Sequence, residues 1–331
     1  MAPHPVTRDD LAGAARAALG RNRALESIAR LAGGSRKGVY RLTMDDGATA
    51  IAYLWARSEN YWPDAADDND DRDPFSPSAG LDRYEAAHAR LDHLGLRVPT
   101  IYLSDRGHTH YPADLIVLED FPGENLEHRL ERDPAAATPT MERLADHLDR
   151  MRHHRAPNYG KVALVDAGGT AHWPTCERAV LALAERCLAE AAARDPRIAG
   201  ARDRLDHRLH ELAGAVRPRA EYSVVHGELG MDHVLIDRDH NPVLIDIENL
   251  MYFDVEWEHV FLRIRLGAEY ERVAVAGLDQ ARLAFYLLAQ RLSLTAGPLR
   301  LLDGDFPDRA FMQAIAEHNL NEALALARRA G

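Results

Sequence analysis

The chain has 331 residues, of which 46% are hydrophobic, and a formal net charge of −12. It is long enough for one large or two medium-sized domains with proper cores, and its negative charge argues against a nucleic-acid or anionic-membrane partner. No segment has the length of an apolar membrane span or of a signal-peptide core, so we expect no membrane partner and a cytoplasmic location. The two cysteines, Cys176 and Cys187, would lie about 16 Å apart on one helix, which is too far for a disulfide.

The first part of the chain is predicted to form short helices followed by strands. Residues 7–30 have the pattern of one or two short helices, with Thr7 at the N-cap. Residues 31–57 alternate as two or three strands, with turns at 33–34 and 45–47.

Residues 60–80 form a polar run without periodicity, which predicts a loop or an insert. The next segment, residues 81–95, has apolar positions at helical spacing and stops at a glycine. Residues 98–126 then predict a strand, a turn and a second strand that ends in a Pro-Gly break at 122–123.

The second part of the chain is rich in helices. Residues 137–155 and 175–215 are rich in alanine and leucine with many arginine–carboxylate pairs, and helices return over residues 254–331. We therefore divide the chain into a strand-rich domain, residues 1–121, and a helix-rich domain, residues 122–331.

The segment VVHGELGMDHVLIDRDHNPVLIDIE, residues 224–248, carries the most chemical information. A strand over 222–225 leads into a polar loop, and two further strands over 233–236 and 243–247 are joined by a polar turn as a hairpin. The loop before the hairpin and the end of its last strand can then converge. Carboxylates brought together in this way suit phosphoryl transfer, in which one faces the acceptor hydroxyl and others hold Mg²⁺.

This segment resembles the aminoglycoside phosphotransferase and choline kinase-like family. The family signature is His-Gly-Asp, four residues, Asn, and then an Asp-x-Glu/Asp strand. The chain has His-Gly at 226–227, the same spacing, and the pair Asp246 and Glu248, but it carries Glu228 for Asp and His233 for Asn. The resemblance implies an α+β, bilobal, protein-kinase-like fold with a five-stranded antiparallel N-lobe and a helical C-lobe.

The resemblance assigns catalytic and metal-binding roles. Glu228 takes the place of the carboxylate that orients and deprotonates the acceptor hydroxyl, and Asp246 that of the metal-binding aspartate. Two residues on, Glu248 would share its strand face, as a second metal ligand, a substrate contact or a solvated side chain. For His233 we weigh a catalytic or metal-binding role, a hydrogen bond to phosphate and simple packing; a nitrogen ligand suits Mn²⁺ or Zn²⁺ better than Mg²⁺. Neighbouring Asp232 is an alternative ligand.

Two acidic residues further along are candidates for substrate binding. Asp254 matches an aspartate that braces the catalytic loop in such enzymes, and Glu258 follows it. These two could bind a cationic substrate, but a helix N-terminus enriched in acidic residues explains them equally.

The nucleotide site is less sharply marked. Gly34, Ser35 and Lys37 lie in a glycine-containing loop whose amides could bind phosphate. The family places a lysine on the following strand, where this chain has Tyr53.

We expect Arg57, paired with Glu85 of the next helix, to replace that lysine, with Arg36 and Lys37 as alternatives. Glu119, in Leu118-Glu119-Asp120, resembles the hinge that holds the adenine edge.

These features predict a small-molecule kinase. It would transfer the γ-phosphate of ATP or GTP, with Mg²⁺ or Mn²⁺, to a hydroxyl of a small and perhaps aminated acceptor such as an antibiotic or another natural product. The main alternative is a pseudokinase that binds nucleotide without efficient phosphoryl transfer. Two residues of the catalytic motif, Glu228 and His233, differ from the family signature, and the lysine is absent from the expected strand. A transferase of another group, or a partner-binding scaffold, is a further alternative.

Overall fold

A computed structural model describes residues 6–32, 34–62, 70–76 and 80–328 of the chain. Its strand-rich part contains α1 (Arg8–Leu19), β1 (Leu25–Arg30), β2 (Gly38–Met44), β3 (Thr49–Leu54), η1 (Arg57–Glu59), α2 (Leu81–His93), β4 (Ile101–Asp105) and β5 (Leu115–Glu119). The strands form one sheet in the order β1-β2-β3-β5-β4, and every neighbouring pair is antiparallel. The predicted five-stranded antiparallel N-lobe is confirmed.

Each face of this sheet has a different partner. Leu42, Ala52 and Leu54 point toward Leu11 of α1 and form a small core. The opposite face carries Tyr53, which joins the large core of the C-lobe. The alternation of inward and outward residues along β2 and β3 therefore leaves one sheet face for the interlobe site.

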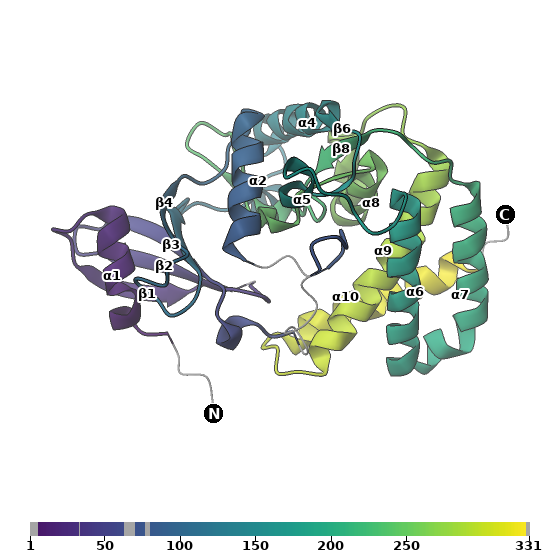
Figure 1. The fold of residues 1–331 in the computed structure, drawn as a ribbon, viewed down its shortest axis with the longest axis horizontal. Helices are drawn as coiled ribbons and strands as arrows, with labels where there is room; N and C mark the ends of the chain where they lie inside the picture. Colours follow the sequence, from purple (N-terminus) through teal and green to yellow (C-terminus); the bar gives the residue numbers. More distant parts are fainter. Residues whose placement is uncertain (1–5, 33, 63–69, 77–79, 329–331) are drawn as a thin grey trace.

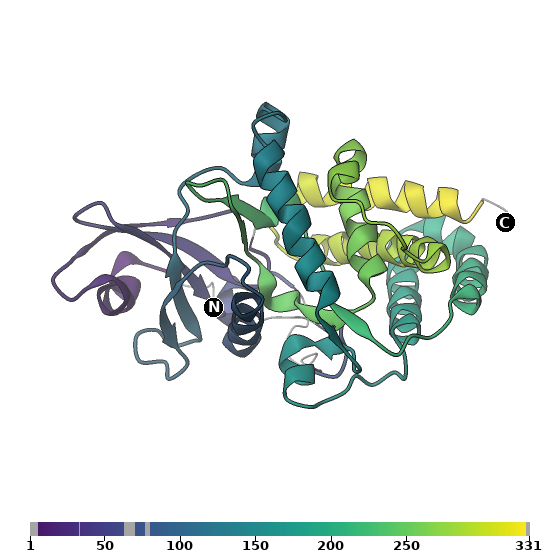
Figure 2. The ribbon, with the colours of Figure 1, turned by 90° about the horizontal axis from the view of Figure 1, so that it is seen from above.

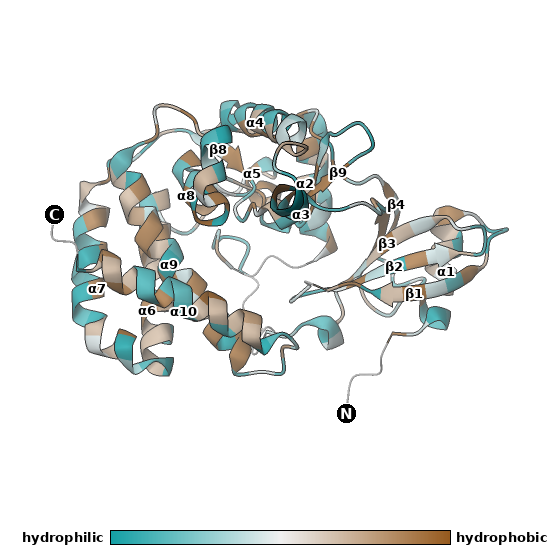
Figure 3. Cartoon of the chain, turned by 180° about the vertical axis from the view of Figure 1, so that it is seen from behind, coloured by the Kyte–Doolittle hydropathy of each residue, from teal (hydrophilic) through white to brown (hydrophobic). Residues whose placement is uncertain are grey.

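The rest of the chain is mainly helical (Figure 1, Figure 2). Its helices are α3 (Leu126–Arg132), α4 (Thr138–His153), α5 (Val162–Asp166), α6 (Cys176–Arg194), α7 (Pro196–Ala215), α8 (Val255–Leu266), η4 (Gly267–Arg272), α9 (Gln280–Leu302) and α10 (Arg309–Leu326). The α9 helix packs against α6, α7, α8 and α10, and Figure 3 shows apolar residues along these helices. The bilobal α+β fold is confirmed, and a lobe boundary at residue 121 stays a prediction.

The short strands position the sequence motif. They are β6 (Arg155–Ala156), β7 (Gly160–Lys161), β8 (Tyr222–Val225), β9 (Val234–Ile236), β10 (Pro242–Leu244) and β11 (Met251–Phe253). β9 and β10 form the predicted hairpin, whereas β8 pairs with β6 and β11. Two 3₁₀ turns, η2 (Met231–His233) and η3 (Ile247–Asn249), flank the hairpin.

Two local predictions were wrong. Residues 25–30 form strand β1 rather than a helix, because pairing with β2 overrides the helix-forming residues of LESIAR. In the motif, β10 ends at Leu244, so Asp246 and Glu248 do not lie on an extended strand. Thr7 does cap α1, in a capping box with Asp10.

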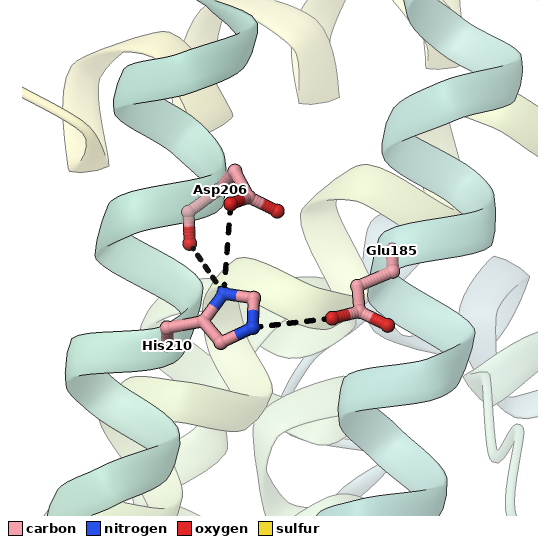
Figure 4. Close-up of side chains that lie close together, drawn as sticks. All are labelled: Glu185, Asp206 and His210. Atoms are coloured by element: carbon pink, nitrogen blue, oxygen red, sulfur yellow. Dashed lines mark hydrogen bonds and ion pairs between the residues drawn. The ribbon is translucent and has the colours of Figure 1, made fainter.

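The α6 and α7 helices are joined by an exposed cluster of Glu185, Asp206 and His210 (Figure 4). His210 Nε2 lies 3.3 Å from Glu185 Oε1, and its Nδ1 lies 3.0 Å from the Asp206 carbonyl oxygen. Exposed contacts of this kind contribute about 0–1 kcal/mol. We interpret the cluster as a surface link between the two helices.

Among the described residues, no helix is long and apolar enough to span a bilayer.

Candidate active site

Buried side chains of the C-lobe hold the loop that follows β8. His226 is fully buried, and its Nε2 donates to the Ile245 carbonyl oxygen at 3.0 Å. The Gly227 amide donates to Glu258 Oε2 at 3.0 Å, while the Gly227 carbonyl accepts from Trp257 Nε1 at 3.2 Å. Gly227 has a φ of 91°, a conformation that favours glycine. These contacts hold the loop that presents Glu228.

A lysine of the N-lobe joins two carboxylates of the C-lobe. Lys37 directly precedes β2 and is only 7% exposed. Its Nζ donates to Asp246 Oδ1 at 2.6 Å and to Glu248 Oε1. Asp246 has φ 57° and ψ 41°, which turns the chain into η3 and lets Glu248 reach the same ammonium group. This contact is the link between the two lobes at the site.

Electrostatics explain the charge states of this cluster. Burial disfavours the charged form of Lys37, but the carboxylates of Asp246 and Glu248 raise the pKa of the lysine above its ordinary value. Desolvation also opposes ionisation of Asp246, yet Lys37 and His233 hold its pKa below its usual range. Desolvation dominates at Glu248, whose pKa is raised. The site therefore has an ionised Asp246 against a charged lysine.

Tyr53 forms one wall of the lysine site. Lys37 Nζ lies 4.6 Å from the centroid of the Tyr53 ring, a cation–π distance. Tyr53 stands on β3 where the resemblance calls for a lysine. The ammonium group of Lys37 thus lies beside the position from which that lysine would project.

Glu228 and His233 face the same space. Asn249 Nδ2 donates to Glu228 Oε2 at 3.2 Å, and His233 Nδ1 donates to the Glu228 carbonyl oxygen at 3.0 Å. His233 Nε2 then points toward carboxylates, 3.6 Å from Asp246 Oδ2 and 3.7 Å from Asp232 Oδ2. Burial lowers the pKa of His233, but these carboxylates outweigh it and the net direction is upward. The raised pKa favours a protonated imidazole, which would donate its Nε2–H to a phosphate, whereas metal binding would require the neutral ring.

A cavity of about 990 Å³ extends from this cluster. It begins at loop residues 34–37 of the N-lobe and passes Glu228 and Asp246. Further walls come from α6, α8, α9 and α10 and from residues 70–76, and Glu127 and Asp232, which share Arg265, also line it. The volume falls within the range of small-molecule sites.

Comparison with known proteins identifies the family. A sequence model of the phosphotransferase enzyme family matches residues 27–298 of the chain. The chain belongs to the phosphotransferase enzyme family. No curated protein sequence matches it.

Solved structures of several phosphotransferases share its fold. A thermostable mutant of aminoglycoside phosphotransferase APH(4)-Ia is 16% identical with a TM-score of 0.59, over 90% of this chain and 95% of that one. Choline kinase LicA from Streptococcus pneumoniae is 13% identical with a TM-score of 0.62, over 96% and 97%. APH(2")-IIia, solved with GDP and kanamycin, is 16% identical with a TM-score of 0.58, over 92% and 93%. At these identities the likeness shows the protein-kinase-like fold.

The two residues expected to contact substrate are instead buried within this phosphotransferase, and neither lines the cavity. Glu258 is bonded to the Gly227 amide, and burial raises its pKa to about 7. Asp254 is 1% exposed and accepts from Arg282 Nε at 2.8 Å and from the Tyr286 hydroxyl at 2.5 Å. The structure therefore places neither carboxylate where a substrate in the cavity would contact it. The contacts of Asp254 run to Arg219, Arg282 and Tyr286, and its role in bracing the catalytic loop stays a prediction.

We expect Asp254→Ala to destabilise the phosphotransferase by about 3–5 kcal/mol, because it removes the closer carboxylate partner of the buried Arg282 and leaves Asp279 Oδ2 at 3.4 Å as the other. Urea unfolding measures the change. The matched control is Asp303→Ala, which removes an exposed partner of Arg194 and should cost about 0–1 kcal/mol. Equal effects of the two substitutions would contradict the assigned role of Asp254.

The expected pairing of Arg57 with Glu85 is not formed. Arg57 is exposed at the start of η1, and Glu85 accepts from Ser104 Oγ at 2.5 Å and from Arg106. Glu119 ends β5, where its carboxylate binds Arg97 and Thr100. Because these contacts occupy the Glu119 side chain, only its backbone is left to hold the adenine edge, and that role stays a prediction.

The glycine-containing loop lies over the cavity as expected. A Cβ at Gly34 would collide with the Lys37 carbonyl oxygen, so this position requires glycine. Ser35 Oγ accepts from Trp62 Nε1 at 3.0 Å, and the Trp62 ring lies under Arg36 and against Arg300 of α9. Gly33 of this loop lies outside the described residues.

Several cavity residues carried no signal in the sequence. The sequence pattern places residues 70–76 in a polar run and predicts a loop there. In the structure, Phe75 of this segment packs against Phe253 and Trp257. Arg186 of α6 and Arg300 of α9 look like ordinary helix-surface arginines. Their place in the cavity follows from helix packing, which a local pattern does not show.

The residues present suit a divalent metal. Asp246 and Glu248 offer carboxylate oxygens, the ligands that Mg²⁺ prefers. Glu248 Oε2 is buried without a hydrogen-bond partner among the described residues. A metal held by these two residues would supply positive charge to the phosphates of a nucleotide.

Proposed function

We propose that this chain transfers the γ-phosphoryl group of ATP or GTP to a hydroxyl of a small molecule. The observation that carries the proposal is the convergence of Lys37 from the N-lobe with Asp246 and Glu248 from the C-lobe, at a cavity that also exposes Glu228. Fixed positive and negative groups at one site suit phosphoryl transfer, where positioning and charge stabilisation supply most of the catalysis.

The proposed roles follow from the geometry. The acceptor oxygen attacks the γ-phosphorus, the bond from that phosphorus to the bridging oxygen breaks, and the nucleoside diphosphate leaves. Glu228 receives the acceptor proton. Asp246 and Glu248 would hold Mg²⁺, or Mn²⁺ if a neutral His233 contributed its Nε2, and residues 34–37 would lie over the phosphates.

Glu228→Gln tests this function. We expect kcat to fall by about 100-fold or more with little change in nucleotide affinity, because the amide accepts no proton. Acceptor-dependent formation of nucleoside diphosphate measures kcat. The control is Glu221→Gln, an exposed residue with the same charge change.

The pH profile gives a second readout of the same residue. Desolvation within the cavity raises the pKa of Glu228. A base must be deprotonated, so kcat should decline on acidification already above the ordinary pKa range of glutamate. Retained activity in Glu228→Gln would refute the base assignment. Nucleotide-induced thermal stabilisation without turnover of any acceptor would favour the pseudokinase.

A further inference from the structure

The cavity wall away from the catalytic carboxylates carries charged residues that already have partners. This acceptor wall consists of cavity-lining residues of α6, α9 and α10 together with Asp73. Arg186 donates to Asp73 Oδ2 at 3.1 Å, and Arg300 Nη1 lies 3.3 Å from Glu190 Oε1. Two acids and two arginines neutralise one another across the wall.

These pairs bear on which ligands the wall suits. An ammonium group that recruited Asp73 or Glu190 would share the carboxylate with an arginine that already contacts it. That arginine would then repel the incoming cation. The carboxylates of the described acceptor wall therefore give little net attraction for a polycation.

Apolar side chains fill much of the remaining surface. Leu183 comes from α6, Leu294 from α9, and Met312 and Ile315 from α10, while Phe261 of α8 lies beside them in the cavity lining. Such surface favours a ligand with an apolar face, because burying it removes both partners from water.

A neutral amide supplies polarity on this wall. Gln290 of α9 lines the cavity and is 2% exposed. Its Nε2 donates to the Trp257 carbonyl oxygen at 2.8 Å, which fixes the side chain. Its Oε1 is buried without a hydrogen-bond partner among the described residues. A ligand hydroxyl would donate a hydrogen bond to this oxygen without bringing a charge into the cavity.

We propose that the acceptor wall binds an uncharged alcohol with an apolar face, rather than an aminated polycation. The inference rests on the proposed function for placing the acceptor in this cavity. It differs from the expectation of an aminated acceptor, because the acidic residues that suggested one, Asp254 and Glu258, lie outside the cavity lining.

Binding of two matched probes tests the inference. Octyl β-D-glucopyranoside and its 2-amino-2-deoxy analogue differ by one hydroxyl replaced by an ammonium group. Calorimetry below the micelle concentration, with AMP-PNP and Mg²⁺ present, gives the dissociation constant of each. We expect the neutral probe to bind about fivefold or more tightly than the amine. Equal or tighter binding of the amine, or no binding of the neutral probe, overturns the proposal.

Arg300→Gln should shift the preference from the neutral probe toward the amine. It leaves Glu190 without its arginine, so the amine should gain about tenfold in affinity, as expected for a hydrogen bond to a charged group. The matched control is Arg197→Gln, which makes the same charge change at a pair with Glu317 outside the cavity and should leave both affinities unchanged. An amine affinity that stays the same in Arg300→Gln overturns the assignment of Glu190.

These binding measurements are separate from catalysis. Failure of phosphoryl transfer with every acceptor would overturn the proposed function but leave the probe preference measurable. A kinase that phosphorylates kanamycin more efficiently than neutral alcohols would keep the function and overturn the inference.

Discussion

Replacing Lys37 by methionine should have one of the largest effects of any single substitution at the site. Methionine keeps most of the side-chain length but removes the ammonium group that contacts Asp246 and Glu248. We expect kcat/KM for the nucleotide to fall by about 100-fold or more, as is typical when a positioned group that stabilises transition-state charge is lost. The only other lysine in the sequence, Lys161, is bonded to Ser76 and cannot substitute.

A second substitution can restore the missing charge from another strand. Lys37 Nζ lies 4.6 Å from the Tyr53 ring, so a lysine at 53 projects toward the same carboxylates. We expect Tyr53→Lys to recover part of the activity in the Lys37→Met background. Steady-state kinetics over a range of nucleotide concentrations measures the recovery.

Arg36→Met is the matched control for this pair of variants, because Arg36 is the neighbouring cation and stacks on Trp62. Its effect should be much smaller than that of Lys37→Met. If Arg36→Met abolishes activity while Lys37→Met does not, the phosphate-binding cation is Arg36 and our assignment is wrong.

The difficulty of finding Lys37 from the sequence has a physical reason. A glycine-containing loop between two strands predicts a turn, but not what its side chains contact. The partners of Lys37 lie 209 and 211 residues away, and their proximity depends on how the two lobes pack. In the sequence, Lys37 is one of several candidate cations. Arg57 is the favoured one there, because its even spacing from Tyr53 predicts the same face of the strand.

The motif itself was easier to place, because its partners are local. The strand over 222–225 follows from a short apolar run, and the hairpin of β9 and β10 from two strands joined by a polar turn. The backbone at Asp246 was not predicted, since a left-handed aspartate leaves no periodic signal. The buried network at Asp254 was equally hidden, because Arg219 and Arg282 approach it from distant segments.

Asp246→Asn should abolish the dependence of nucleotide binding on metal. Asparagine adopts the left-handed conformation that position 246 requires, so the fold should be retained while the charge is lost. Lys37 keeps its contact with Glu248, which further protects the interlobe contact. We expect the affinity for ATP with Mg²⁺ to drop by about 100-fold, because a hard cation loses a charged oxygen ligand.

Measuring the ATP affinity without Mg²⁺ distinguishes a metal ligand from a residue that only shapes the pocket. In the absence of Mg²⁺, the carboxylate of Asp246 repels the phosphates, so Asp246→Asn should bind metal-free ATP as tightly as the wild type or more tightly. Calorimetry with and without Mg²⁺ gives both values, and Asp239→Asn in the exposed hairpin turn controls for the charge change. An equal loss of affinity under both conditions would show that Asp246 shapes the pocket and does not bind metal. Unchanged affinity under both would remove Asp246 from the nucleotide site altogether.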